Sequence, residues 1–195
     1  MKDWSGNKTS TITTSGFHNN SVHSRDFNDF YATDPIALEK LLKYETFNNV
    51  WECACGDGNL SEVLKKYGIH GRSSDIIKRK YECEIIDFLN YDGDWQGDII
   101  TNPPYKYATD FVYKALSIIP PGNKIAMFFP QRYLSSKGRY KLFVENPPKV
   151  VYAFSGRVSC ALNNDWNAHS GSAVDYMWIV WVKGYHGETI LRWIL

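Results

Sequence analysis

The sequence predicts an α/β protein built on a mainly parallel, doubly wound sheet with helices on both faces. Short apolar stretches alternate with amphipathic helical patterns through most of the chain, and a Gly-rich turn, two acids and a double proline directly follow such stretches. Alternating strands and helices favour parallel pairing, because each helix returns the chain to the same end of the sheet. In such a sheet, ligands bind at the carboxyl ends of the strands.

The first expected helix begins after Asp34, which can cap its N-terminus, and Pro35 suits its first turn. Leucines then recur at helical spacing as far as about Tyr44. The preceding residues, 1–28, are rich in Ser, Thr, Asn and His and lack apolar periodicity. We therefore expect a polar N-terminal arm, flexible or ordered only against a partner, followed by a single domain over residues 29–195.

The remaining elements follow from apolar runs and helical spacing. We expect strands over Val50–Ala54, Gly71–Ile76, Cys83–Phe88, Asp98–Asn102, Lys124–Pro130, Lys149–Phe154 and Asp175–Val182, and helices over Asn59–Tyr67, Ala108–Ile118 and Lys137–Glu145. A last strand over Glu188–Ile194 follows a short turn, which predicts a C-terminal antiparallel hairpin. Only about seven residues separate the second and third strands, fewer than a parallel crossover normally needs. Either the helix there is reduced to a turn or the strand limits differ.

The composition is that of an ordinary globular protein. The chain has 195 residues, 44% of them hydrophobic, and 22 Lys and Arg against 21 Asp and Glu give a formal charge of +1. This balance does not indicate a nucleic-acid binder by bulk electrostatics, although it permits a local basic face. No apolar run approaches the roughly 20 residues of a membrane span, so we expect a cytoplasmic protein without a membrane partner.

The four cysteines do not have the paired CxxC spacing of a zinc site. Two of them, Cys53 and Cys55, lie in an apolar strand-like run. We therefore expect reduced, buried thiols and no metal site.

The stretch ECACGDGNL, from Glu52 to Leu60, predicts a strand that leads into a Gly-rich turn and then a helix. Gly56 and Gly58 permit a tight turn and a close approach of the backbone to a ligand. The dinucleotide fingerprint GxGxxG is incomplete, because Ser61 stands at its last position. A simple strand-to-helix turn is the alternative interpretation.

Two acids, Asp75 and Asp87, end the second and third expected strands. A carboxylate at the end of the second strand can bind a ribose diol in such folds. The alternative is that both acids face water.

The stretch TNPPY, from Thr101 to Tyr105, ends the fourth expected strand. The prolines stop the strand and stiffen the chain. They also leave the Pro103 carbonyl beside the Asn102 amide, so that two oxygens can accept both hydrogens of a planar amino group. The ring of Tyr105 can stack on the base that carries this amine. We interpret Asn102, Pro103, Pro104 and Tyr105 as a catalytic amine clamp.

In this order, ECACGDG, Asp75, the DF at Asp87 and NPPY resemble the class I methyltransferases that use S-adenosylmethionine, and among them the DNA adenine-N6 enzymes. The stretches GNKTS, NDFYATDP and DIITNPPY are similar to small adenine methyltransferases common in bacteriophages and prophages. The resemblance covers about Asn28 to Arg132, and the last third of the chain only in strand pattern. It implies a Rossmann-like, mostly parallel seven-stranded sheet, S-adenosylmethionine as cofactor and a bacterial host cytoplasm as location.

Position by position, the resemblance implies that residues 31–33 help to hold the methionine part of the cofactor and that Glu52, Gly56 and Gly58 belong to the cofactor-binding loop. It further implies that Asp75 binds the ribose, and that Asp87 with Phe88 binds the adenine. Such loops more often carry Pro and Ala where this chain has Cys53 and Cys55. The implied cofactor-binding residues are Tyr31, Ala32, Thr33, Glu52, Gly56, Gly58, Asp75, Ile76, Asp87, Phe88 and Asn102.

The implied partner is DNA, single-stranded or double-stranded with the target base flipped out, because an amine inside a duplex cannot reach such a pocket. Phosphate contacts are expected from Lys106, directly after NPPY, and from Arg132, Lys137 and Arg139 in a locally basic segment. A solvated amphipathic helix is the alternative for that segment. Base recognition is expected from the polar arm or from the Asn-rich loop 155–173.

Other functions remain open. The NPPY stretch also suits an adenine or guanine amine in RNA or a protein glutamine amide, because each presents a planar NH2 group. An inactive nucleic-acid-binding module that retains the fold is the non-enzyme alternative, although the intact glycines, acids and NPPY argue against it. A cytosine-N4 enzyme would more often carry SPPY, and the incomplete fingerprint disfavours a nicotinamide oxidoreductase.

Overall fold

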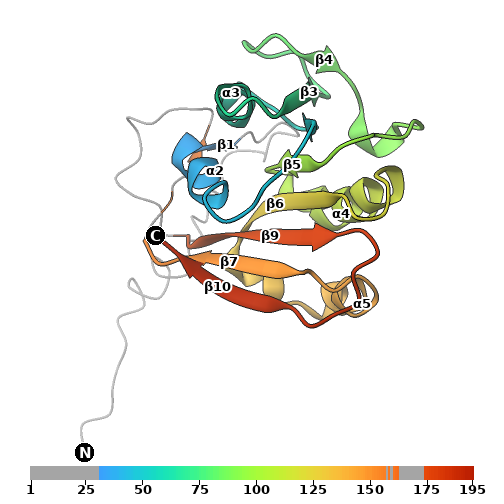
Figure 1. The fold of residues 1–195 in the computed structure, drawn as a ribbon. Helices are drawn as coiled ribbons and strands as arrows, with labels where there is room; N and C mark the ends of the chain where they lie inside the picture. The colour runs from blue at the N-terminus through green and yellow to red at the C-terminus, as the bar shows by residue number, and fades with distance from the viewer. Residues whose placement is uncertain (1–30, 157, 159, 163–173) are drawn as a thin grey trace, which may run out of the picture.

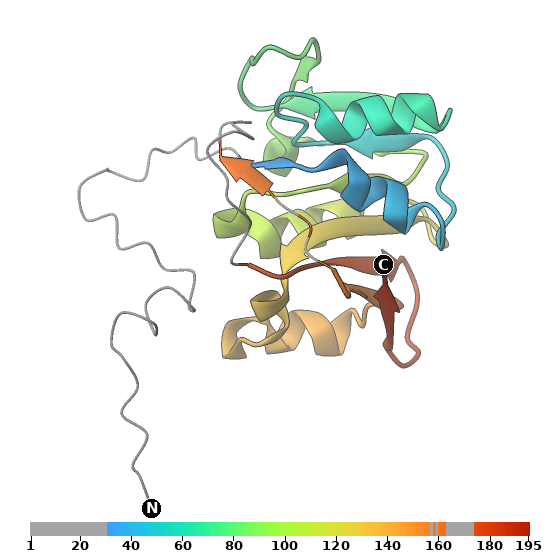
Figure 2. The ribbon, with the colours of Figure 1, turned by 90° about the vertical axis from the view of Figure 1, so that its left-hand side faces the viewer.

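A computed structural model places the strands in a sheet with helices on both sides (Figures 1 and 2). It describes residues 31–156, 158, 160–162 and 174–195, so the predicted arm and most of the loop 155–173 lie outside the described residues. The main strands are β2 (Val50–Glu52), β3 (His70–Asp75), β4 (Glu84–Ile85), β5 (Ile99–Thr101), β6 (Lys124–Pro130), β7 (Val150–Phe154), β9 (Tyr176–Val182) and β10 (Ile190–Ile194).

These strands form one sheet in the order β10-β7-β9-β6-β5-β2-β3-β4. All neighbouring pairs are parallel except β6 with β9 and β7 with β9. Two short strands, β1 (Tyr31–Thr33) and β8 (Cys160–Leu162), pair antiparallel as a separate ribbon. The expected α/β architecture with a mostly parallel sheet is therefore confirmed.

The helices are α2 (Pro35–Leu41), α3 (Asn59–Lys66), α4 (Ala108–Ile118) and α5 (Tyr140–Glu145). The 3-10 turns are η1 (Phe88–Asn90), η2 (Tyr105–Tyr107), η3 (Gln131–Leu134) and η4 (Lys137–Arg139). The Asp34 side chain caps α2 as predicted, accepting from the backbone N–H of Ile36 at 3.0 Å.

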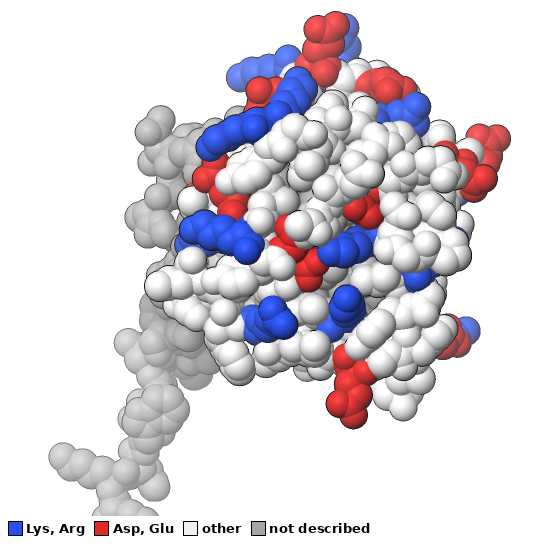
Figure 3. Space-filling view, viewed as in Figure 1, with Lys and Arg blue, Asp and Glu red and all other residues white. Residues whose placement is uncertain are grey.

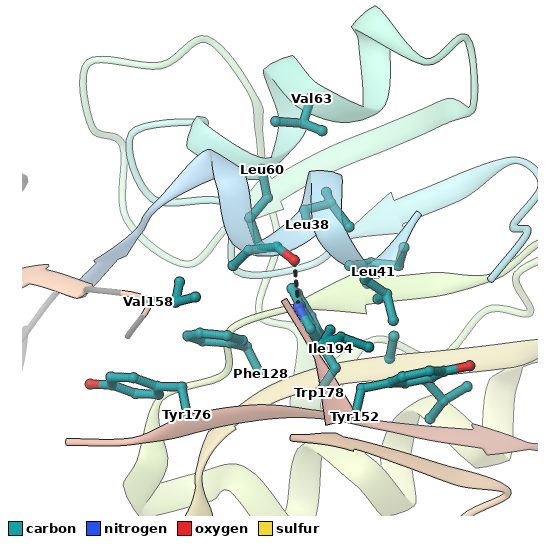
Figure 4. Packing of buried hydrophobic residues seen from close by; sticks show 14 of the residues in the cluster. Leu38, Leu41, Leu60, Val63, Phe128, Tyr152, Val158, Tyr176, Trp178 and Ile194 are labelled. Carbon is teal, nitrogen blue, oxygen red and sulfur yellow. Dashed lines mark hydrogen bonds between the residues drawn. The ribbon is translucent and has the colours of Figure 1, made fainter. Parts of the chain in front are cut away.

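Two hydrophobic cores lie on opposite faces of the sheet. Helices α2 and α3 pack on one face, and α4 with α5 packs on the other. On the first face, the indole N–H of Trp178 in β9 donates to the Ala37 carbonyl of α2 at 2.9 Å (Figure 4). A buried indole needs such a partner, because an unpaired polar group in a core costs free energy.

The predicted C-terminal hairpin is wrong. Strands β9 and β10 run in opposite directions, but β7 lies between them, and β10 pairs with β7 in parallel. The reason is the burial of β9, whose residues from Tyr176 to Trp181 are all buried. A strand that is apolar on both faces is stabilised by a central position with two neighbours. The sheet has eight strands in the described part of the chain, which matches the number of apolar runs and is one more than the family resemblance implies.

The short link between the second and third predicted strands is confirmed. Residues 76–83 contain no helix, and β4 nevertheless pairs in parallel with β3. The link packs on the N-terminus of α3 through Tyr81, whose ring lies against Gly58. It leaves β4 as a two-residue strand at one edge of the sheet.

Candidate active site

The carboxyl ends of β3, β2 and β5 are adjacent, since these three strands are neighbours in the sheet and run in parallel. The Gly-rich turn follows β2, Asp75 ends β3 and Asn102 follows β5. Three motifs that are distant in sequence therefore meet at one edge of the sheet. This is the edge at which α/β sheets bind ligands.

The Gly-rich turn has the tight conformation expected of it. The backbone N–H of Gly58 donates to the Cys55 carbonyl at 2.8 Å, and the φ angles of Gly56 and Gly58 are +55° and +82°. A Cβ atom at Gly58 would overlap the ring of Tyr81. Both the positive φ and the lack of space require glycine at this position. Both glycines of the turn are buried, and Tyr81 covers Gly58.

The side chain of Asp75 is hydrogen-bonded to the Gly-rich turn after β2 and to the link that follows β3. One carboxylate oxygen accepts from the N–H of Gly56 at 2.8 Å, and the other accepts from the N–H of Ile77 at 3.0 Å. The side chain is buried, so the alternative of an acid facing water does not describe it. By contrast, the side chain of Ile76 is 61% exposed. An exposed apolar side chain next to a fixed carboxylate suits a nucleoside, and the contact itself stays a prediction.

Glu52 lies beneath the turn and is only 2% exposed. It accepts a hydrogen bond from Ser61 at the start of α3, whose hydroxyl also bonds Ser73 at 2.6 Å. Burial raises the pKa of Glu52 from 4.5 to about 8, against the lowering effect of Ser61. Glu52 thus connects β2 to α3 and β3, and direct contact with a cofactor stays a prediction.

Asp87 and Phe88, the residues predicted to bind adenine, differ in their exposure to solvent. Asp87 is exposed and caps η1, accepting from the N–H of Leu89 at 3.1 Å and from Asn90 at 2.7 Å. The side chain of Phe88 is buried in the second core, with its ring 5.3 Å from that of Trp51. Phe88 can therefore meet a ligand only through its backbone, whereas Asp87 is accessible. Neither contact is tested by the geometry.

Asn102 is held by the short ribbon of β1 and β8. Its Nδ2 donates to Thr33 Oγ1 at 3.0 Å and lies 4.0 Å from the sulfur of Cys160. Thr33 and Cys160 are paired in the ribbon and are both buried. Burial raises the pKa of the Cys160 thiol to about 12, so it is neutral at physiological pH. The bond to Thr33 fixes which end of the amide points toward β1.

The same ribbon contacts the helix that follows the Gly-rich turn. The side chain of Asn59, the first residue of α3, donates to the backbone carbonyl of Thr33 at 3.3 Å. Ala32 is buried, and Tyr31 pairs with Leu162 at the ribbon's other end. Thr33 therefore contacts both Asn102 and the first residue of α3, although the predicted contact of residues 31–33 with methionine is untested.

The rest of NPPY leads into a turn rather than extending β5. Pro103 is buried, Pro104 is exposed, and the Pro104 carbonyl accepts from the N–H of Tyr107 at 2.9 Å to close η2. Tyr105 packs against the first core, and burial raises the pKa of its hydroxyl above the ordinary value. Stacking of a base on this ring stays a prediction.

Comparison with solved structures identifies the fold. A protein from Agrobacterium tumefaciens described as an O-methyltransferase is 13% identical, with a TM-score of 0.59 over 83% of this chain and 86% of that one. A protein from Listeria monocytogenes described as a class I S-adenosylmethionine-dependent methyltransferase is 14% identical, with a TM-score of 0.53 over 82% of this chain and 62% of that one. The chain has the class I methyltransferase fold. The aligned part of this chain spans about three fifths of the length of the Listeria protein.

The same fold occurs in a Lactococcus lactis protein described as a hemolysin, which is 10% identical with a TM-score of 0.57 over 81% of this chain and 91% of that one. No family model and no curated protein matches the sequence. Likeness at such low identity concerns the methyltransferase fold and not the acceptor. The acceptor must therefore be argued from the site.

Within the methyltransferase fold, the predicted phosphate ligands follow the strands that end at the site. Lys106, Arg132 and Lys137 are exposed there. Arg139 is different, because its guanidinium donates to the carbonyls of Tyr133 at 2.6 Å and Arg132 at 3.2 Å. These two bonds compete with the phosphate contact predicted for Arg139, which stays untested.

Sequence reasoning missed three parts of this site. The basic run 78–80 begins three residues after the end of β3, with Lys78 and Lys80 exposed, and Lys and Arg side chains near α3 and β4 are interspersed with Asp and Glu in Figure 3. A scan for charge runs would have found it. The contacts of Cys160 and of Thr33 with Asn102 have no sequence signal, because their partners are 58 and 69 residues away.

All four cysteines are free, with Cys83 half-buried and the others buried. In the described ranges, no group of three or more His, Cys, Asp or Glu side chains can hold a metal ion. No helix in those ranges is long and apolar enough to cross a bilayer.

Proposed function

We propose that this protein transfers a methyl group from S-adenosylmethionine to the N6 amine of adenine in DNA. The observation that carries the proposal is the position of Asn102, whose amide is fixed by Thr33 at the edge where the Gly-rich turn and Asp75 also lie. A methyl donor and an amine acceptor must meet within bonding distance. The residues proposed to bind the cofactor and those proposed to bind the amine lie together at this edge.

The residues present fit the cofactor. The Gly-rich turn at Gly56 and Gly58 brings the chain round at the end of β2, and Asp75 offers carboxylate oxygens already oriented by two backbone N–H groups. The exposed side chain of Ile76 can pack on the face of an adenine. When bound, S-adenosylmethionine supplies an electrophilic methyl group on a sulfonium.

Asn102 acts on the acceptor amine. An aromatic amine is a poor nucleophile, because its lone pair is delocalised into the ring. The Nδ2 of Asn102 is directed to Thr33, so its Oδ1 lies on the opposite side of the amide and can accept an amine hydrogen. Together with the Pro103 carbonyl, it favours a pyramidal nitrogen and stabilises the positive charge that develops on it. The methylated ammonium is acidic enough to lose its proton to water, so no strong general base is required.

The DNA phosphates meet basic side chains on both sides of Asn102. Lys78 and Lys80 follow β3, whereas Arg132 and Lys137 follow β6, and both groups lie at the carboxyl edge of the sheet. Strands β3 and β6 are three places apart in the sheet, or about 14 Å at the usual strand spacing. This basic row supports a nucleic-acid acceptor over a small molecule.

The test is an acceptor assay with methyl-tritiated S-adenosylmethionine. The protein is incubated separately with DNA, with RNA and with a ribosomal protein fraction, and the labelled material is digested to nucleosides or amino acids. Label in N6-methyladenine from DNA supports the proposal. Label confined to RNA or to methylglutamine contradicts the DNA assignment, and cofactor binding without transfer to any fraction supports the inactive module.

A further inference from the structure

Helix α5 and the turn η4 before it present one strip of exposed side chains. The strip, which we call the Tyr140 strip, consists of Lys137, Tyr140, Lys141 and Val144. Residues three and four positions apart lie on the same side of a helical segment, so these four side chains are neighbours. Tyr140 is 70% exposed and Val144 is 60% exposed, whereas Leu142 on the other side of α5 is buried in the second core.

The Tyr140 strip combines an aromatic ring with positive charge. Lys137 and Lys141 flank Tyr140, and both are exposed. Glu145, the acid of α5, lies 3.7 Å from Lys141 in an exposed ion pair. Such pairs contribute little free energy, so a phosphate can replace the carboxylate as the partner of Lys141. The strip thus offers a flat ring between two cations.

The Tyr140 strip is joined to the end of β6 through Arg139. The Arg139 guanidinium lies 4.3 Å from the centroid of the Tyr133 ring and donates to the Tyr133 carbonyl at 2.6 Å. The Tyr133 ring stacks on Phe129 of β6, with 3.9 Å between the ring centroids. Arg139 therefore acts as a positioning residue, which holds the strip against η3 and the sheet.

The same contacts place the start of the Tyr140 strip on the side of the sheet where Asn102 lies. Strands β5 and β6 are parallel neighbours, so NPPY after β5 and η3 after β6 lie at the same edge. The hydroxyl oxygens of Tyr133 in η3 and Thr109 in α4 are 3.2 Å apart, and α4 follows NPPY and η2. A nucleic-acid strand with one base at Asn102 can therefore continue over η3 toward Tyr140.

We propose that the Tyr140 strip binds a single-stranded segment of the DNA next to the base at Asn102. A neighbouring base stacks on Tyr140, and phosphates meet Lys137 and Lys141. An unpaired base offers its face to an aromatic ring, whereas a base inside a duplex is covered by its neighbours. The lysines serve either form of DNA, so the ring is the feature that selects a single strand. This inference rests on the proposed function for the acceptor and extends it to the strand state.

The chemistry of the Tyr140 strip favours this occupant over two others. A membrane-binding helix needs a broad apolar face, whereas lysines are interspersed with the ring here and Val144 is the one aliphatic member of the strip. An apolar protein surface would bury both lysines without partners, which costs free energy. A nucleic-acid strand instead offers phosphates to the lysines and base faces to the ring.

The test measures binding of the full chain to fluorescein-labelled oligonucleotides by fluorescence anisotropy, without a methyl donor. The probes are an adenine-containing single strand of DNA, its duplex and the RNA strand of the same sequence. Tyr140→Ala should weaken binding of the DNA single strand by at least about fivefold, the loss of one stacked base, and leave duplex binding unchanged. Tyr140→Phe keeps the ring and should bind the single strand as the wild type does.

Lys137→Gln should weaken binding of both DNA probes, because it removes a phosphate contact. For the single strand, the slope of log affinity against log salt concentration should fall in magnitude by about 0.7. The matched control is Tyr67→Ala. Tyr67 is 44% exposed with Lys66 Nζ 5.8 Å from its ring centroid, but it lies near the amino end of β3. Its loss should leave all affinities unchanged, and circular dichroism checks that each variant remains folded.

Unchanged single-strand affinity in Tyr140→Ala overturns the proposal, and so does an equal loss of duplex affinity. A loss in Tyr140→Phe as large as in Tyr140→Ala overturns base stacking. A loss seen with the RNA strand alone overturns the assignment to DNA, and binding of phosphatidylserine vesicles in place of oligonucleotides assigns the strip to a membrane.

The proposed function fails separately from this inference. Single-strand binding that depends on Tyr140 in a protein that transfers no methyl group upholds the strip and overturns the function. Methyl transfer to DNA adenine that Tyr140→Ala leaves at the wild-type rate, at limiting DNA, upholds the function and overturns the strip.

Discussion

The two halves of the candidate site are held together in different ways. In the half proposed to bind the cofactor, called the cofactor half in contrast to the proposed acceptor half, the Gly-rich turn closes on itself and the Asp75 carboxylate accepts from two backbone N–H groups, so most bonds involve the main chain. In the acceptor half, Asn102 is held by side chains of Thr33 and Cys160, which come from a separate ribbon. The first half therefore depends on backbone conformation, and the second depends on the docking of distant segments.

This difference predicts distinct failures. A substitution in the cofactor half should impair cofactor binding together with local stability, because the same backbone serves both. A substitution in the acceptor half should impair turnover while cofactor affinity persists. Separate measurements of cofactor affinity and of the rate of transfer therefore distinguish the two halves.

The largest effect is expected for Asn102→Ala. Loss of one preorganised group that stabilises developing charge typically lowers kcat by a factor of about 10² to 10³. Affinity for S-adenosylmethionine, measured by calorimetry, should change little. Turnover within twofold of wild type would remove Asn102 from the mechanism, whereas complete loss of cofactor binding would place it in the cofactor half.

The next effect is expected for Gly58→Ala, compared with Gly184→Ala. Both glycines have nearly the same φ, +82° and +85°, so both substitutions carry a backbone strain of roughly 1–2 kcal/mol. A Cβ at Gly58 also overlaps Tyr81, whereas nothing lies within 4 Å of one at Gly184. Gly58→Ala should therefore lower the free energy of unfolding more than its control and weaken cofactor binding.

Equal losses of stability in the two glycine variants would contradict the packing of Tyr81 on the turn. Unchanged cofactor affinity in Gly58→Ala would contradict the role of the turn in binding.

A smaller effect is expected for Thr33→Val, which keeps the shape of the side chain and removes the hydroxyl that accepts from Asn102. Loss of the bond frees the amide to rotate, so kcat should fall by about tenfold, equivalent to 1.4 kcal/mol. Thr33→Ser retains the hydroxyl and is the matched control. If Thr33→Ser loses as much activity as Thr33→Val, packing rather than the hydrogen bond holds Asn102.

The last prediction concerns stability, and no effect on turnover is expected from it. The folded protein keeps the Glu52 proton up to about pH 8, whereas the unfolded chain releases it near pH 4.5. The contribution of Glu52 to the free energy of unfolding should therefore fall as the pH rises from about 4.5 to about 8 and level off above. Glu52→Gln removes this contribution. Urea unfolding at several pH values should show a flatter pH profile for the variant, and identical profiles would contradict the raised pKa.

The two halves also differ in how far the sequence reveals them. Local patterns predict the Gly-rich turn, the acid at the end of β3 and the end of β5 at NPPY. Each of these features is set by the backbone preferences of neighbouring residues. The hydrogen bond between Thr33 and Asn102 joins residues that are 69 positions apart in the sequence, so no local pattern encodes it. The C-terminal hairpin was predicted wrongly for the same reason, because β7, which is distant in sequence, lies between β9 and β10 in the sheet.

The central claim is that Asn102 directs methyl transfer to the adenine amine of DNA. It is tested most directly by mass spectrometry of nucleosides from the DNA of bacteria that lack adenine methylation and produce either the wild-type chain or Asn102→Ala. The account predicts N6-methyldeoxyadenosine with the wild-type chain and none above background with the variant. The same amount with both chains, or methylation of cytosine in place of adenine, would contradict it.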